Sequence, residues 1–260
     1  TIERNWRVTS YSALTVQHAT APHNSSAKNS SEEGPAIESP VIESLPAASA
    51  DTAEPVIVTP AEPAAPVYDV YHFPKGARAG TFLHSLLEDL DFRSDADTRR
   101  QWIEQHLQGV QLCRDWQAEH WFPTLEGWLT QMLHSELFPG LSLAMLAPSQ
   151  CLSEMEFFLP LSTMSAGALN RCLVAGDPLS ARAAPLSFQE VQGMLKGFID
   201  LVFEQDGRFY VVDYKSNYLG DQPQAYTREA MAEAMIEHRY DVQYQLYTLA
   251  LHRYLKTRIP

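Results

Sequence analysis

The sequence predicts a mixed α/β fold in which helices flank a central mixed sheet. Three observations lead to this expectation. Apolar residues recur at helical spacing early in the folded region, an alternating strand pattern follows, and a strong hairpin signal precedes two further helical patterns. Helices, a strand, a hairpin and then long helices, in that order, are typical of a sheet with helices on both faces.

Residues 15–66 differ in composition from the rest of the chain. They hold eight of the 17 prolines, seven acidic residues and one lysine, but no Phe, Trp or Tyr. Such a stretch buries too little apolar surface to offset the entropy lost on ordering, so we expect a disordered acidic insertion. The predicted domain is therefore residues 67–260, and residues 1–14 form a short strip that belongs to it.

Three helices are predicted ahead of the strand. They are expected at residues 80–92, 97–108 and 124–137. The first, GTFLHSLLEDLDF, has apolar residues at helical spacing and carries His84. Trp102 and Trp128 are predicted to anchor the other two helices in the core.

The segment SEMEFFLP, residues 153–160, has the alternation of a β-strand. Met155 and the apolar residues at every second position after it alternate with Glu154, Glu156 and Phe158. One or both glutamates would therefore lie on a single face of the strand. Because an outward glutamate is usually just solvated, neither one indicates a site by itself.

The stretch at residues 197–217 has two β-rich runs joined by Asp-Gly, the strongest short hairpin signal. A two-residue turn there places Asp200 directly opposite Asp213, whereas a longer, bulged turn would shift the register by one residue. Like charges in opposed positions destabilise a sheet. Lys215 shares the face of Asp213 because strand side chains alternate. A buried pair of carboxylates in this place needs a cation.

Two helices are predicted after the hairpin, at residues 226–236 and 240–256. In the second, Gln243 and Tyr247 are four residues apart and so share one face. An ordinary amphipathic helix would explain this pair equally well.

The opposed aspartates could bind a hard divalent cation such as Mg²⁺, which prefers oxygen ligands. Asp200 and Asp213 would each supply one oxygen, and the main-chain carbonyl of Tyr214 is the nearest further donor. Lys215 would then help to orient the attacking water and stabilise developing charge on a phosphate. The simpler alternative is that Asp213 pairs with Lys215 and no ion binds.

The order of the candidates is more specific than any one of them. His84 alone could simply pair with Glu88, four residues on. Along the chain, the candidate residues are a His on a helix, a Glu on a strand, D-x₁₂-D-x-K on a hairpin and Q-x₃-Y on a helix. In this order the chain resembles the C-terminal nuclease domain of the RecB family, in the RecB-like branch of the PD-(D/E)xK phosphodiesterases. The segments that carry the resemblance are WRVTSYS (6–12), GTFLHSLLEDLDF (80–92), EMEFFLP (154–160), MLKGFIDLVF (194–203), VVDYKSN (211–217) and HRYDVQYQLYTLALHRYL (238–255).

The resemblance covers essentially all of the chain except the predicted insertion. It implies a restriction-endonuclease-like core and a Mg²⁺-dependent deoxyribonuclease for double-strand-break processing and recombinational repair, with Ca²⁺ or Mn²⁺ able to replace Mg²⁺. The implied site has metal ligands, catalytic groups and residues that support the site or position DNA. Carried over by position, the metal ligands are His84, Asp200, Asp213 and the main-chain carbonyl of Tyr214. The catalytic residues are Lys215, Asp213, Asp200 and Glu154, the last in preference to Glu156. The supporting residues are Gln243 and Tyr247.

The resemblance also implies partners. They are DNA delivered as a single strand, RecC-like and RecD-like subunits, the helicase part of RecB and the strand-exchange recombinase. The chain has no G-x-x-x-x-G-K-[ST] loop, so no ATP site is expected and the chain would be only the nuclease end of such a protein. The family continues with further strands after the last helix, so we expect the domain to be truncated at its C-terminal end.

Composition narrows the alternatives. The acidic balance, with a formal net charge of −13, argues against a large non-specific nucleic-acid surface, although basic DNA paths could belong to other domains. Without a long apolar run or a signal sequence, a cytoplasmic bacterial protein with no membrane segment is expected. Cys113, Cys151 and Cys172 lack the spacing of a zinc or iron–sulfur site, which argues against an iron–sulfur RecB-like exonuclease. The other rival is a catalytically idle docking module that recruits partner subunits or the recombinase.

Overall fold

The computed structural model describes residues 6–10, 14–15 and 66–259. The chain divides into two units, residues 1–21 with 67–260 and residues 22–66. Nearly all of the predicted insertion, and part of the predicted N-terminal strip, lie outside the described residues. Every element described below belongs to the first unit. No helix of this described part is long and apolar enough to cross a membrane.

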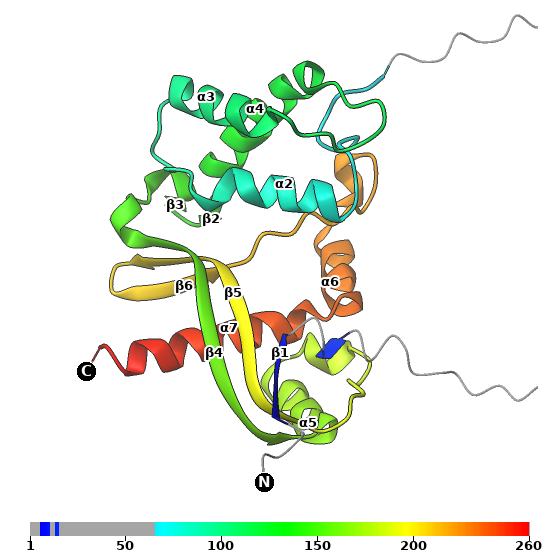
Figure 1. The fold of residues 1–260 in the computed structure, drawn as a ribbon, viewed down its shortest axis with the longest axis vertical. Helices are drawn as coiled ribbons and strands as arrows, with labels where there is room; N and C mark the ends of the chain where they lie inside the picture. The colour runs from blue at the N-terminus through cyan, green and yellow to red at the C-terminus, as the bar shows by residue number, and fades with distance from the viewer. Residues whose placement is uncertain (1–5, 11–13, 16–65, 260) are drawn as a thin grey trace, which may run out of the picture. The chain divides into compact units, whose positions relative to one another are not determined.

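A mixed four-stranded sheet runs through the first unit, as predicted (Figure 1). Its strands are β1 (Trp6–Ser10), β4 (Cys151–Met164), β5 (Val191–Gln205) and β6 (Arg208–Val212). β4 runs antiparallel along one edge of β5, and the other edge is shared by parallel β1 and antiparallel β6. β1 pairs with β5 as far as Lys196, and β6 pairs with β5 from Leu201 onward. Residues 197–200 of β5 therefore lie between these two partners.

The hairpin of β5 and β6 has the predicted register. Gln205 pairs with Arg208 and Leu201 with Val212, which confirms a two-residue turn and excludes the bulged alternative. The turn residues Asp206 and Gly207 have φ values of 52° and 74°. Two positive φ angles define a type I′ turn, whose twist matches that of the flanking strands and which favours Asp-Gly.

Three helices and one end of the sheet share the first core cluster. The helices are α2 (Ala77–Glu88), α3 (Ala96–Leu107) and α4 (Ala118–His134). Their buried leucines and Ile103 pack with Leu201 and Phe203 of β5. α4 begins at Ala118 rather than residue 124, because the buried Trp121 extends its apolar stripe across Pro123. Among the tryptophans whose burial is described, Trp121 is the buried one, whereas the predicted anchors Trp102 and Trp128 are only partly buried against the cluster.

The second core cluster joins the sheet to α7 (Tyr240–Lys256), which crosses the strands in Figure 1. Leu195 and Ile199 of β5 pack there with Ala250 and Leu251 of α7. The predicted helix before it is α6 (Arg228–Glu237), capped by the Thr227 side chain. The remaining elements are α5 (Ala166–Gly176), β2 (Glu136–Phe138), β3 (Leu141–Ser142) and short 3-10 turns at Leu143–Met145, Pro148–Gln150, Ser180–Arg182 and Pro223–Ala225.

The alternation of β5 breaks at Asp200. Ile199 packs into the second cluster, whereas Leu201, two residues on, packs into the first. In a regular strand these two side chains would share a face. The neighbouring strand is irregular at the same level, since Glu154 of β4 has a left-handed φ of 48°. The sheet is therefore distorted where its predicted site residues lie.

Substituting Gly197 by Ala should destabilise the fold. A Cβ atom at this position of β5 would lie 2.5 Å from the ring of Phe157, its cross-strand partner. Overpacking of this kind costs about 1–3 kcal/mol, to be measured by urea unfolding. Gly127→Ala in α4 is the matched control, because a Cβ there meets nothing within 4 Å. The control should be neutral or stabilising by about 0.5–1 kcal/mol, and equal effects of both substitutions would contradict the prediction.

Candidate active site

The two aspartates of the hairpin lie where β6 separates from β5. β6 ends at Val212, and beyond it the main-chain N–H of Tyr214 donates a 2.7 Å hydrogen bond to Oδ2 of Asp200. The Asp200 side chain thus bridges the split between the two strands. The side chains of Asp200 and Asp213 are only 13% and 16% exposed. The hairpin therefore brings two mostly buried carboxylates together, as its register predicts.

His84 approaches Asp200 from α2. Its Nδ1 atom lies 3.6 Å from Oδ2 of Asp200, and its ring meets that of Tyr214 edge-on with centroids 6.1 Å apart. The sequence alone left Glu88 as an ordinary partner for this histidine. In the structure, His84 instead lies within ion-pair distance of Asp200, one of the predicted metal-binding aspartates.

Asp213 lies between a cation and an amide. The Lys215 ammonium forms an ion pair with Oδ2 of Asp213, and Nε2 of Gln243 donates a 3.0 Å hydrogen bond to Oδ1. Burial raises the pKa of Asp213, the Lys215 charge opposes the rise, and the Asp200 charge adds to it. Because burial dominates, the ionised form is disfavoured despite the lysine. A carboxylate held in this way is typical of functional sites.

Glu154 and Glu156 of β4 have different partners. Glu154 lies at the level of Asp200, between the pairs Ser153–Leu201 and Met155–Ile199, and its backbone has a left-handed φ. Burial raises the pKa of Glu154, and the charges of Asp200 and Glu88 raise it further. Glu156 instead forms a 2.6 Å ion pair with Lys196 on a partly exposed surface. Of the two glutamates, only Glu154 is therefore placed with the hairpin carboxylates.

The first turns of α7 contribute two further residues to the site. Gln243 and Tyr247 share a helix face, as predicted, and Nε2 of Gln243 donates a 2.7 Å hydrogen bond to the Tyr247 hydroxyl. Burial raises the pKa of Tyr247 to about 12, so its phenol keeps its proton at neutral pH. The same amide group also holds Asp213. Gln243 therefore orients the carboxylate, and Tyr247 orients Gln243.

The donor set suits a hard divalent cation. Such ions prefer oxygen ligands and keep several waters, and the carboxylates of Asp200, Asp213 and Glu154 supply oxygens here. The buried Oε1 atom of Gln243 has no hydrogen-bond partner within the described part of the chain, and a coordinated water is a donor of the kind that it lacks. Among the described residues, no three His, Cys, Asp or Glu side chains form a ready-made metal cluster. In this conformation, the Asp213 carboxylate engages Lys215.

Sequence patterns did not single out Tyr240 and Asn217. The Lys215 ammonium lies 4.5 Å from the centroid of the Tyr240 ring, and the Tyr240 hydroxyl donates a 3.1 Å hydrogen bond to Oδ1 of Asn217. A ring beneath an ammonium group attracts it and limits its movement. Tyr240 precedes Gln243 by three residues on α7, so shared helical spacing was the signal that could have identified it.

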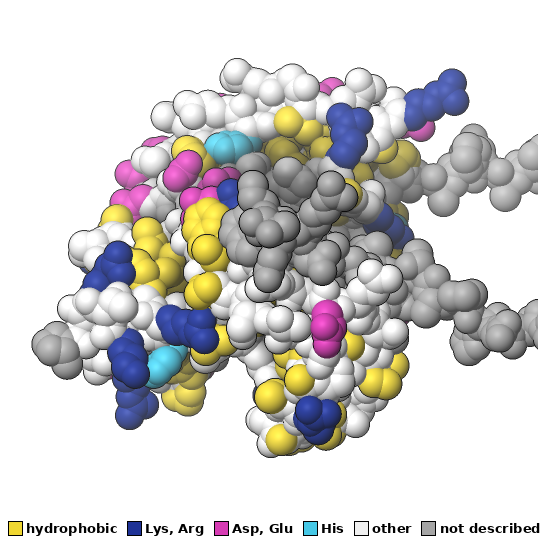
Figure 2. Space-filling view, turned by 60° about the horizontal axis from the view of Figure 1, so that its bottom comes forward, with side chains coloured by type: hydrophobic (Ala, Val, Ile, Leu, Met, Phe, Trp, Pro, Cys, Tyr) yellow, Lys and Arg dark blue, Asp and Glu magenta, His cyan; other side chains and the backbone are white. Residues whose placement is uncertain are grey.

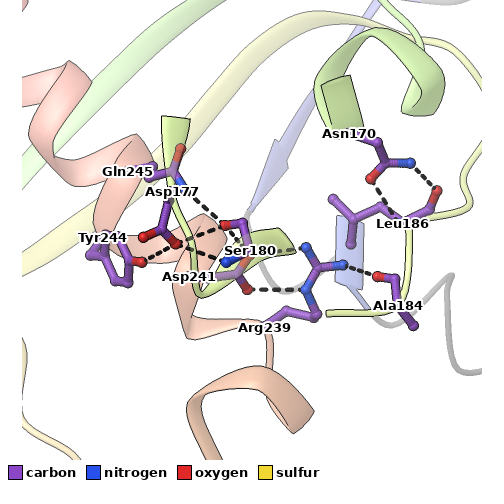
Figure 3. A network of polar contacts seen from close by, with 9 residues as sticks. All are labelled: Asn170, Asp177, Ser180, Ala184, Leu186, Arg239, Asp241, Tyr244 and Gln245. Carbon is purple, nitrogen blue, oxygen red and sulfur yellow. Dashed lines mark hydrogen bonds and ion pairs between the residues drawn. The ribbon is translucent and has the colours of Figure 1, made fainter. Parts of the chain in front are cut away.

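A buried polar network fixes the start of α7 (Figure 3). The Arg239 guanidinium donates two hydrogen bonds of 3.0 Å to the carboxylate of Asp241, which is fully buried. The Ser180 hydroxyl donates to the same carboxylate at 2.7 Å. Asp177 joins the network by accepting hydrogen bonds from the main-chain N–H of Ser180 and from the hydroxyl of Tyr244 of α7. The network therefore ties the segment after α5 to the helix turn that carries Tyr240 and Gln243.

Comparison with known proteins decides the family. A sequence profile of the PD-(D/E)XK nuclease superfamily matches residues 70–258, a range that includes all the site residues described above. The chain belongs to this nuclease superfamily. The mixed sheet and its flanking helices fit that assignment. Nucleases of the PD-(D/E)XK superfamily generally use a divalent metal ion, which agrees with the oxygen-rich donor set.

Similar proteins confirm the likeness to RecB. The chain is 44% identical over 260 residues to the RecBCD enzyme subunit RecB of Escherichia coli, covering 98% of this chain and 19% of that protein. It is 34% identical over 262 residues to RecB of Haemophilus influenzae, covering 100% and 20%. The RecB of Mycobacterium tuberculosis is 33% identical over 216 residues, covering 71% and 19%. The chain thus spans about a fifth of the length of these RecB relatives.

Proposed function

We propose that this chain is the nuclease domain of a RecBCD-type helicase-nuclease and cleaves phosphodiester bonds of DNA with Mg²⁺. The observation that carries the proposal is the convergence of Asp200, Asp213 and Lys215 at the split between β5 and β6. The order of these residues is that of the D…DxK motif. Relatives that share the motif region are named as RecB subunits of the RecBCD enzyme, which favours DNA as the substrate.

In the proposed mechanism, Asp200, Asp213, His84 and the carbonyl of Tyr214 would hold the divalent ion. The ion, when bound, supplies positive charge that stabilises the phosphate as its charge increases in an in-line displacement. Lys215 orients the attacking water and the scissile phosphate. Its ammonium group starts from a defined place, between the Asp213 carboxylate and the ring of Tyr240.

The remaining residues have supporting roles in the proposal. Glu154 lies near Asp200 in a partly buried place that raises its pKa, where it helps to position and activate the water. Gln243 and Tyr247 hold the Asp213 carboxylate in one orientation. Preorganised groups of this kind lower the barrier because they need not rearrange during the reaction.

The proposed partners follow from the relatives' names. RecC-like and RecD-like subunits and the helicase part of a RecB protein would deliver one DNA strand to the site. Exposed hydrophobic residues on the strands, including Phe158 and Phe198, offer contact surface for such partners. Figure 2 shows hydrophobic side chains exposed among lysines and arginines on one face, with acidic groups gathered mainly at one side. Recruitment of the strand-exchange recombinase stays a prediction of the resemblance.

The test is cleavage of labelled single-stranded DNA with Mg²⁺ and with EDTA, in wild type and Asp200→Asn. We expect cleavage only by wild type with Mg²⁺, and a loss of at least about 100-fold in the variant. Asp206→Asn is the matched control, because it makes the same change in the turn of the same hairpin, where Asn-Gly is equally favoured. Equal cleavage by wild type and Asp200→Asn would exclude the proposed site.

Calorimetric titration with Ca²⁺ separates the nuclease from a docking module. A nuclease site should bind the ion in wild type and bind it at least about tenfold more weakly in Asp200→Asn, because a carboxylate ligand is lost. A docking module has no reason to hold an ion at these aspartates. Absence of Ca²⁺ and Mg²⁺ binding by wild type would therefore favour the docking role.

A further inference from the structure

A cavity of about 560 Å³ opens beside the proposed reacting groups. Asp213 and Lys215 line it, together with the aromatic residues Tyr71, Trp128, Tyr218 and Tyr226. The volume falls within the range of about 300–1,000 Å³ that is typical of small-ligand sites. None of these four aromatic residues has a part in the chemistry proposed above. The cavity therefore offers binding surface that the reacting groups do not explain.

Two tyrosines from distant segments meet in this cavity. The rings of Tyr71 and Tyr226 lie 5.5 Å apart between centroids, at an angle of 53°. Both residues are only partly buried, so part of their ring surface is open. The Tyr226 hydroxyl accepts a 3.4 Å hydrogen bond from the N–H of Leu219, which links it to the segment after Lys215. The aromatic surface is thus attached to the same chain segment as the catalytic lysine.

A lysine lies over the most exposed of these rings. The ammonium of Lys75 is 3.2 Å from the centroid of the Tyr218 ring, and Tyr218 is 45% exposed. An aromatic residue with this exposure contributes little to a core, and the part of the Tyr218 ring that Lys75 does not cover can stack on a base. The ammonium group is a suitable partner for a phosphate oxygen at the cavity wall. The cavity therefore combines stacking surface and a cation next to the proposed phosphodiester-cleaving groups.

We infer that this cavity binds one unpaired nucleotide next to the phosphodiester that is cleaved. The base stacks on the tyrosine surface, and Lys75 contacts the phosphate of that nucleotide. This inference rests on the proposed function, and it makes the unpaired state of the strand a requirement of the site. A base within a duplex has both faces covered by its neighbours, so it can enter the cavity only after it has left the stack.

The test measures binding of a labelled single-stranded oligothymidylate in EDTA, so that cleavage does not interfere. Stacking of one base contributes about 1–3 kcal/mol, which corresponds to about a 5- to 150-fold change in Kd. Tyr218→Leu should weaken binding by a factor in this range, whereas Tyr218→Phe keeps the ring and should stay within about twofold of wild type. A strand of the same length made of abasic deoxyribose phosphates should bind Tyr218→Leu and wild type equally, because it has no base to stack.

Lys75→Gln provides a second and independent measurement. Loss of one phosphate contact should lower the slope of log Kd against log salt by about 0.7 for a single strand. The effect should be the same for the normal and the abasic strand, because both carry phosphates. An unchanged slope would exclude Lys75 as a phosphate contact.

The outcomes separate this inference from the proposed function. Unchanged binding in Tyr218→Leu, or equal weakening for the abasic strand, would overturn the nucleotide site and leave the cavity as a contact for another polypeptide. Mg²⁺-dependent cleavage by wild type would be unaffected by that result. Base-dependent binding in a chain that cleaves no DNA would support the cavity assignment and overturn only the nuclease proposal.

Discussion

Replacing Asp213 by Asn should remove most DNA cleavage while leaving the metal-free protein as stable as wild type, or more so. The expected loss in kcat is at least about 100-fold, because the variant loses a ligand for the ion and the anionic partner of Lys215. Folding should not suffer, because burial raises the pKa of Asp213. A carboxyl group whose pKa is raised by folding loses stabilisation as pH rises through its unfolded value toward its folded value. At pH 7 a neutral amide avoids that penalty.

The measurements are single-stranded DNA cleavage with Mg²⁺ and thermal melting in EDTA at pH 7. Glu156→Gln is the matched control, since it removes a carboxylate that pairs with Lys196 instead, and it should leave cleavage within about twofold. The double variant Asp213→Asn with Lys215→Gln should lose little more activity than either single variant, because the effects of substituting residues that act as a unit are strongly non-additive. Cleavage by Asp213→Asn within about tenfold of wild type would contradict the role given to this carboxylate.

The hairpin and the helices were predictable because their signals are local. An Asp-Gly turn between two β-rich runs sets the register without help from the rest of the chain, and the observed pairs follow it. Helical periodicity in the same way identified α2, α3, α6 and α7 to within a few residues. The face shared by Gln243 and Tyr247 follows from four-residue spacing alone. The site residues on these elements could therefore be placed before the fold was known.

The features that the sequence pattern misjudged or left open depend on tertiary packing. The strand pattern left both Glu154 and Glu156 as candidates, whereas in the fold the backbone of β4 is distorted at Glu154 and the charge of Asp200 acts on Glu154. No local signal marks such a distortion, because Glu is not a residue that favours positive φ. The helix α4 extends across Pro123 because Trp121 is buried, which again depends on what packs against it. The contact of Tyr240 with Lys215 joins two elements whose relative placement only the fold determines.

Removing the Asp241 carboxylate should destabilise the fold by about 3–5 kcal/mol. Asp241 is fully buried and Arg239 is 5% exposed, so Asp241→Ala leaves a guanidinium group buried without its counter-charge. The Ala184 carbonyl still accepts a 2.7 Å hydrogen bond from Arg239, but it carries no net charge. Urea unfolding should show the loss, and the melting temperature should fall by roughly 10 °C. Glu233→Ala removes the exposed ion pair with Arg182 and is the control, expected to cost less than about 1 kcal/mol.

A double variant, Arg239→Met with Asp241→Leu, separates the contribution of this ion pair to the stability of the fold from its effect on the site. Apolar replacement of both partners of a buried pair is often neutral, so most of the lost stability should return. The Arg239 backbone has a left-handed φ of 57° immediately before α7, and the pair spans the turn that aims Tyr240 and Gln243. If the network positions those residues, the stable double variant should still cleave DNA at least about tenfold more slowly, through kcat rather than KM. Full activity would show that the ion pair serves stability alone.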